Sequence, residues 1–249
     1  MRFLFAAAVM SVALQAQAIT NVEEKRAVED KPGWHNRAEV GFDAESGNKE
    51  KRLWNVGLNT AWQNEQDRVF AWANRVYGST NGIRTDDNTF FHGRFVHNHK
   101  QTWSQESFIQ FERDPFAYLM RRALIGGNIR HQNLFGDDNR IYVGAGLFHE
   151  RVEERDINND EFKSQLTRAN LYTHLQWGMG YGMLQTTLYI QPSVDDTSDT
   201  RALWQFAYSL PVSKIVDLKW QWQSRWDTEP PEGAEYHNHQ THLKVVVRF

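Results

Sequence analysis

The chain has 249 residues, a formal net charge of −3 and no cysteine. A charge so close to neutral gives no electrostatic footprint for a nucleic-acid partner, and the lack of cysteine excludes disulfides and thiol chemistry.

The N-terminus predicts a secretory signal peptide over residues 1–18. Arg2 supplies a positive charge, residues 3–14 are an apolar run, and residues 16–18 (Ala-Gln-Ala) form a small-x-small cleavage site. The apolar run is too short to cross a membrane as a helix. Residues 19–33 carry mixed charge and few apolar side chains, which predicts a flexible periplasmic lead-in.

From residue 34 to the C-terminus, the sequence predicts amphipathic strands separated by turn residues. The alternation is clearest at residues 216–226, where Trp220 and Trp222 share one face and Lys219 and Gln221 share the other. Twelve segments show such a pattern: 37–44, 54–62, 68–79, 89–97, 103–112, 116–130, 141–147, 171–177, 184–191, 201–209, 216–226 and 239–249. Strands of about ten residues suffice to cross a bilayer of roughly 30 Å.

The lengths of the connections support a membrane barrel over a soluble sandwich. If the N-terminus is periplasmic, the odd-numbered connections face outward and are expected to be longer. The longer ones are 45–51, 80–88, 153–163 and 227–235, and the short inward ones include 64–67, 178–182 and 212–215. A short turn at Asp114-Pro115 is the exception.

These patterns together predict an all-β fold: a transmembrane antiparallel up-and-down β-barrel of about 12 strands, forming one domain over residues 34–249. The chain contains 10 Trp and 15 Phe, enough aromatic side chains for girdles at the membrane surface. The tryptophans expected to face lipid are Trp62, Trp177, Trp204, Trp220, Trp222 and Trp226. The predicted location is the cell outer membrane.

The last strand ends on an aromatic residue, Phe249. Leu243 and Val245 share its face, whereas Lys244 and Arg248 lie on the other. This ending is similar to the closing strand of bacterial outer-membrane barrels, in which a terminal Phe serves as an assembly signal. The similarity implies that the barrel-assembly machinery is a partner.

Further stretches resemble one family. They are residues 108–116 (Phe-Ile-Gln-Phe-Glu-Arg-Asp-Pro-Phe), Arg122, Leu124, Gly126-Gly127, the hairpin 226–233 (Trp-Asp-Thr-Glu-Pro-Pro-Glu-Gly) and the ending 245–249. These residues resemble the salt-induced outer-membrane protein family, also called domain of unknown function 481. The resemblance covers residues 52–249 and implies a fold and a compartment rather than an activity. It supplies no catalytic residues.

Polar residues on the inward faces of the predicted strands define a candidate lumen. They are Glu106, Gln110, Glu112, Arg201, Gln205, Asp217, Lys219, Gln221, Gln223, Arg225, Lys244 and Arg248. Two interpretations stay open. In one, ion pairs between neighbouring strands fill a narrow interior and make a structural or adhesive barrel. In the other, the lumen is a restricted pore for small polar solutes. A role as an envelope-stress component is an alternative to the pore.

A third hypothesis is an outer-membrane hydrolase that uses the barrel as a scaffold. Ser224 and His239 have lipid-facing parity on strands joined by one hairpin, so a symmetric register brings them side by side. His237 and His239 also share a face, but no third ligand has a recognisable spacing. We therefore predict no catalytic residues, no metal and no cofactor. The expected partners are outer-membrane lipid and lipopolysaccharide, the expected oligomeric state is a monomer, and no nucleic acid is expected.

Overall fold

The computed structural model describes residues 21, 23, 32–47, 49–136, 139–156, 158–213, 215–230 and 235–247. The strands are β1 (Gly33–Glu45), β2 (Lys51–Gln63), β3 (Asp67–Thr80), β4 (Ile83–His97), β5 (Trp103–Asp114), β6 (Leu119–Phe135), β7 (Asn139–Arg155), β8 (Glu161–Met179), β9 (Gly182–Pro192), β10 (Thr200–Pro211), β11 (Val216–Asp227) and β12 (His237–Val247). A short 3-10 helix, η2 (Pro115–Ala117), lies between β5 and β6. The predicted signal peptide at residues 1–18, Arg248 and Phe249 lie outside the described residues.

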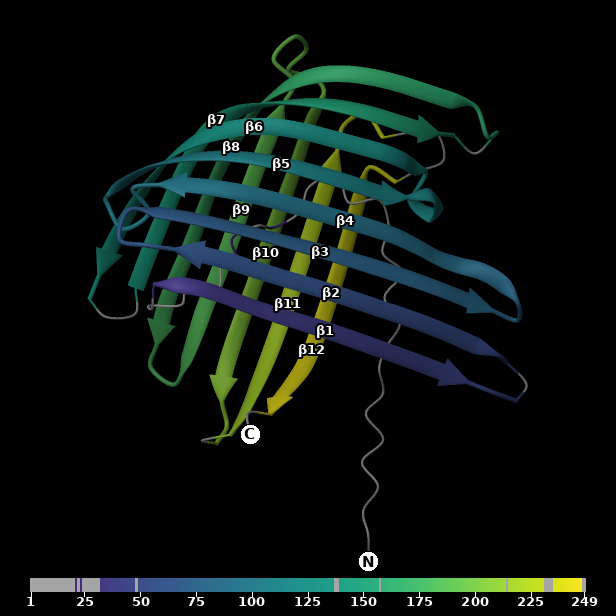
Figure 1. The fold of residues 1–249 in the computed structure, drawn as a ribbon, viewed down its shortest axis with the longest axis horizontal. Helices are drawn as coiled ribbons and strands as arrows, with labels where there is room; N and C mark the ends of the chain where they lie inside the picture. Colours follow the sequence, from purple (N-terminus) through teal and green to yellow (C-terminus); the bar gives the residue numbers. More distant parts are fainter. Residues whose placement is uncertain are drawn as a thin grey trace, which may run out of the picture.

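The strands form one 12-stranded sheet in which each strand is hydrogen-bonded to the next along the chain, in the order β1 to β12. Every pairing is antiparallel. The sheet curls over, so that β1 to β6 lie in front of β9 to β12 in Figure 1. The predicted all-β, antiparallel up-and-down β-barrel of 12 strands is confirmed.

The sheet has two edges, β1 and β12. Within the described ranges, no hydrogen-bonded register joins β1 to β12. Strand β1 is accordingly open, since its lumen-facing side chains Arg37 and Glu39 are 76% and 63% exposed. An unpaired edge in a bilayer leaves backbone groups without partners, at several kcal/mol each. We therefore expect β1 and β12 to pair in the membrane.

The register divides the side chains into an apolar outer face and a polar inner face. Val56, Leu58, Ile109, Ile125 and Leu147 all face outward, and each is at least 39% exposed. Aromatic residues and charged residues occupy the inner face, where Phe70, Trp72, Phe90 and Val96 form one buried cluster. This is the inside-out arrangement of a barrel with lipid outside and polar groups inside. No helix in the described part of the chain is long and apolar enough to cross a membrane.

One predicted connection is wrong. Residues 83–88 belong to β4, and β3 and β4 are joined by the two-residue turn Asn81-Gly82, with φ values of 50° and 78°. An Asn-Gly pair with two positive φ angles makes the tight hairpin turn that matches strand twist. The inward connection 98–102, by contrast, has five residues. Loop length therefore does not alternate along the chain as the sequence suggested.

A smaller correction concerns the start of β6. The sequence placed Phe116 in the sixth strand, but it lies in η2, and β6 begins at Leu119. Pro115 starts this turn, and Tyr118 ends it in the left-handed region with φ 62°. The fixed φ of proline suits the first position of a helical turn rather than a paired strand.

Candidate functional site: the polar lumen

The structure places most of the predicted lumen residues on the inner face. Glu106, Gln110, Glu112, Arg201, Gln221 and Arg225 are buried. Gln205, Asp217, Lys219 and Gln223 are partly buried. Lys244 is exposed, and Arg248 lies outside the described residues. Register pairs such as Gln205 with Gln223 keep these side chains on one face of the sheet.

The most buried charges gather around one carboxylate, that of Glu150 in β7, which is 0% exposed. The Arg122 Nε atom lies 2.7 Å from it, the Arg168 Nε atom 2.6 Å and an Arg201 Nη atom 3.1 Å. These guanidinium groups come from β6, β8 and β10. Because β10 is not hydrogen-bonded to β7 in the sheet, the Arg201 contact crosses the lumen.

Three further acids surround this group. Arg168 also binds Asp199 at 2.7 Å, Arg201 binds Asp227 at 3.0 Å, and Arg122 lies 3.6 Å from Glu112. We call the set the Glu150 cluster: Glu112, Arg122, Glu150, Arg168, Asp199, Arg201 and Asp227. Alternating charges of this kind neutralise one another in a site from which water is excluded. The cluster fills the lumen near the ends of the strands that carry η2 and the connection 193–199.

A second polar group lies beside this cluster, around Glu106 of β5. Its carboxylate accepts a hydrogen bond from Arg94 at 2.7 Å and a longer one from Asn128 at 3.4 Å. Asn170 donates to Asn128 at 3.0 Å, and Gln191 donates to Asn170 at 2.8 Å. These residues form an amide ladder that runs along the inner wall from β5 to β9.

The segment expected to be a periplasmic lead-in enters the barrel at its two described residues. Asn21 donates to Thr187 at 3.3 Å and to Gln205 at 2.5 Å. The Glu23 carboxylate lies 3.2 Å from Arg130 and is nearly inaccessible to solvent. These two residues thus contact the inner wall of the barrel, and the periplasmic lead-in over residues 19–33 stays a prediction. Arg130 faces the lumen and attracts the Glu23 carboxylate, which composition alone does not reveal.

A cavity of about 330 Å³ remains in the lumen beside the Glu150 cluster, which it meets at Glu112. Its wall is about equally polar and apolar and carries both signs of charge, with contributions from Arg37, Glu39, Asn55, Glu112, Gln205 and Arg225. Asn21 lies at this wall as well.

Sequence reasoning missed the centre of the site. Glu150 and Arg168 fell outside the predicted seventh and eighth strands, which ended at residue 147 and began at residue 171. Continued alternation was the available signal, since Phe148, Glu150 and Val152 are all buried. Arg122 lay in a predicted strand but was not assigned to the lumen. His92, which is 1% exposed and 2.8 Å from Gln110, was also missed.

The expected proximity of Ser224 and His239 is confirmed. The two residues are directly opposite in the register of β11 and β12, and Ser224 Oγ lies 2.7 Å from His239 Nδ1. The imidazole stacks on Trp222 and meets the edge of Trp226. Ser224 is 0% exposed, so no substrate reaches its hydroxyl in this conformation. Within the described residues, no group of three or more His, Cys, Asp or Glu gathers to hold a metal ion.

An apolar exterior, a polar interior and a continuous meander of 12 strands define the class: an up-and-down β-barrel of the transmembrane kind. The chain belongs to the family described as "Protein of unknown function, DUF481", which matches residues 38–249. The family resemblance read from the sequence is thereby confirmed.

Among solved structures, the chain is similar to domains of autotransporters. The translocator domain of autotransporter NalP from Neisseria meningitidis has 11% sequence identity and a TM-score of 0.41, with 87% of each chain covered. The beta domain of the Bordetella autotransporter BrkA has 11% identity and a TM-score of 0.38, with 87% of this chain and 98% of that chain covered. No curated protein matches the sequence.

Proposed function

We propose that the protein is an outer-membrane β-barrel whose restricted lumen lets small polar solutes pass. The observation that carries the proposal is the cavity of about 330 Å³ inside the barrel, beside the packed Glu150 cluster. An inner wall with mixed charge favours solutes that hydrogen-bond over apolar ones. The cluster keeps the remaining passage narrow.

The outer-membrane location is part of the proposal. It is supported by the exposed apolar side chains on the outer face and by the predicted export signal at residues 1–18. Phe249, as a C-terminal aromatic residue, is proposed to be recognised by the barrel-assembly machinery. Separating the membranes of cells that express the full chain tests the location, and recovery of the chain in the inner membrane or the soluble fraction contradicts it.

Conductance of the purified chain in planar bilayers tests the passage. We expect small single-channel steps in the unmodified protein. Asn55→Trp, which places an indole in the cavity wall, is expected to reduce the steps at least severalfold. Val56→Trp is the matched control, because Val56 directly follows Asn55 in the chain but faces outward and is 39% exposed. The proposal is contradicted if the unmodified protein gives no conductance at any salt concentration or voltage. It is also contradicted if the two variants give conductance steps of equal size.

The contacts of the N-terminal segment give a further prediction for the same assay. Deletion of residues 19–31 is expected to increase the conductance, because it removes Glu23 from Arg130 and Asn21 from Gln205. Glu23→Lys is expected to act in the same direction through repulsion by Arg130. The control is Glu65→Gln, which alters an exposed pair with Lys100 in a turn. If neither the deletion of residues 19–31 nor Glu23→Lys changes the conductance, the segment does not restrict the lumen.

A hydrolase is the second candidate, favoured by the hydrogen bond between Ser224 and His239. Chemistry at this pair requires the Trp222 and Trp226 side chains to move, because the hydroxyl is covered. Incubation with phospholipid vesicles gives the test. Release of fatty acid that is abolished by Ser224→Ala supports the hydrolase, and equal release by the variant removes it. A salt-stress role rests on the family resemblance alone.

A further inference from the structure

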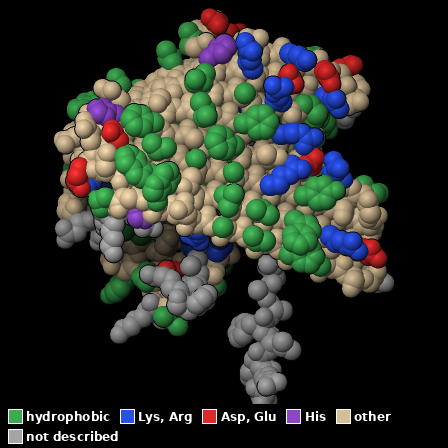
Figure 2. Space-filling model, in the orientation of Figure 1, with side chains coloured by type: hydrophobic (Ala, Val, Ile, Leu, Met, Phe, Trp, Pro, Cys, Tyr) green, Lys and Arg blue, Asp and Glu red, His purple; other side chains and the backbone are tan. Residues whose placement is uncertain are grey.

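Basic side chains gather on the outer face of the barrel at one end of the strands. They occupy strands from β2 to β8, close to the turn Asn81-Gly82 and to η2. Figure 2 shows them as blue groups at the right of the front face, beside the green apolar side chains of its centre. We call the set the basic belt: Arg52, Arg75, Arg84, Arg113, Arg121, Arg151 and Lys163.

Nearby carboxylates balance the belt only in part. Glu153 lies 3.9 Å from Lys163 and is paired with Arg121 in the register. Arg75, Arg84 and Arg113 all bind the single carboxylate of Asp87, with the Arg84 and Arg113 contacts at 3.2 and 2.8 Å. Asp87 is buried, whereas these three arginine side chains remain 44%, 55% and 38% exposed. Three cations on one buried anion leave net positive charge at the surface. Arg84 also lies over the ring of Tyr77, 5.3 Å from its centroid.

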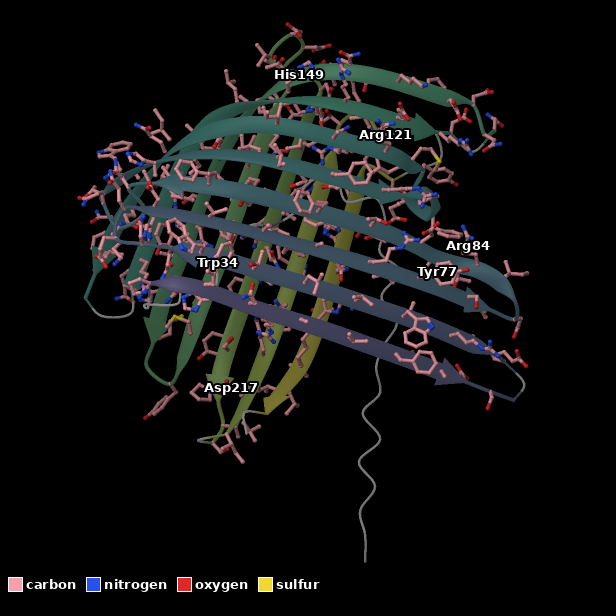
Figure 3. The ribbon with its side chains drawn as sticks, viewed as in Figure 1. Trp34, Tyr77, Arg84, Arg121, His149 and Asp217 are labelled. Carbon is pink, nitrogen blue, oxygen red and sulfur yellow. The ribbon has the colours of Figure 1, made fainter. Side chains whose placement is uncertain are left out.

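Aromatic residues lie on the outer face at the opposite end of the barrel. Trp34, Trp103 and Trp177 are 68%, 60% and 42% exposed there. Figure 3 shows Trp34 at one end and Arg84 and Arg121 at the other. The basic belt therefore marks one of the two membrane surfaces. With the N-terminal end of β1 in the periplasm, it marks the external surface.

The apolar band that adjoins the belt identifies the partner. Trp54, Val56, Ile109 and Ile125 are exposed on the outer face of strands that also carry belt residues. An apolar band next to a row of cations is complementary to a lipid whose acyl chains adjoin an anionic headgroup. The guanidinium fork matches the oxygens of a phosphate group in a bidentate manner.

We propose that the basic belt binds the phosphate groups of outer-leaflet lipopolysaccharide, with its acyl chains on the adjoining apolar band. The inference shares the outer-membrane placement with the proposed function but does not depend on an open lumen.

The test uses the full chain in detergent, with purified bisphosphorylated lipid A and its dephosphorylated form as probes. Native mass spectrometry measures how much of each remains bound. We expect the unmodified protein to retain the phosphorylated form at least tenfold more tightly, and added salt to weaken its binding. Equal retention of the two probes would overturn the proposal.

Two variants separate binding from folding. Arg121→Gln with Arg151→Gln leaves the Asp87 group intact and is expected to lower the affinity for phosphorylated lipid A at least tenfold. Lys100→Gln, in the connection at the other end of β4 and β5, is the control and is expected to bind like the unmodified protein. Full binding by the double variant would overturn the belt as the site. Equally tight binding of phosphatidylglycerol would overturn lipopolysaccharide as its occupant.

Discussion

Glu150→Gln is expected to lower the free energy of unfolding by about 3–5 kcal/mol. The substitution removes the negative charge that Arg122, Arg168 and Arg201 share and leaves these guanidinium groups facing one another in a buried site. Removal of one partner from a buried ionic group costs more than the pair contributes, because the remaining charges stay desolvated. Urea unfolding of the protein in lipid vesicles, followed by tryptophan fluorescence, gives the measurement.

Glu161→Gln is the matched control for this variant. Glu161 lies on the neighbouring strand β8 and pairs with Arg155 at 2.7 Å, but both side chains are exposed. Solvent screens exposed pairs, so little change in stability is expected. If the two glutamine variants unfold at the same urea concentration, the Glu150 cluster does not hold the lumen together.

Gly146→Ala is expected to destabilise the barrel by about 1–3 kcal/mol or more, as overpacked interiors do. Gly146 lies in β7 directly between Asn128 of β6 and Asn170 of β8. A Cβ atom at this position collides with the Gly127 carbonyl oxygen and with the Asn128 Oδ1 atom. The missing side chain thus allows the two asparagines to bond to each other across β7.

Gly93→Ala provides the comparison, because a Cβ atom on this outward-facing strand residue meets nothing closer than 3.5 Å. We expect the same unfolding midpoint for Gly93→Ala as for the unmodified protein. Equal stability of the Gly146 and Gly93 variants would show that the wall between β6 and β8 has room that the structure does not indicate.

The sequence predicted the number of strands and their inward and outward faces because a strand alternates its side chains with a period of two. It underestimated the length of β7 for a physical reason. Beyond Leu147 the outward residues are His149 and Arg151, so the apolar alternation stops where the strand leaves the apolar band. The hydrogen-bonded pairing continues to Arg155, because backbone pairing does not need apolar side chains.

Contacts across the lumen were beyond prediction. Residues such as Gln205 and Gln223 were placed correctly on the inner face, since face depends only on parity. The approach of Arg201 to Glu150 depends on the curvature of the sheet, because their strands are not neighbours. The entry of Glu23 into the barrel depends in the same way on where Arg130 lies after folding.

Closure of the barrel between β1 and β12 in the membrane is the central claim, and the lack of native cysteine makes it directly measurable by disulfide cross-linking. Ala38→Cys in β1 is combined in turn with Cys at His239, Thr241 or Leu243 of β12, all on the outer face. A disulfide needs Cα atoms roughly 4.4–6.8 Å apart, so it reports paired strands.

The measurement is oxidation in isolated outer membranes, followed by electrophoresis of the unfolded chain. We expect one of the three pairs with Ala38→Cys to form an intramolecular cross-link in high yield. Glu39→Cys, which faces the lumen, is the control and is expected to form no cross-link with the same three positions of β12. No cross-link in any register, or cross-links only between two chains, would contradict a closed barrel.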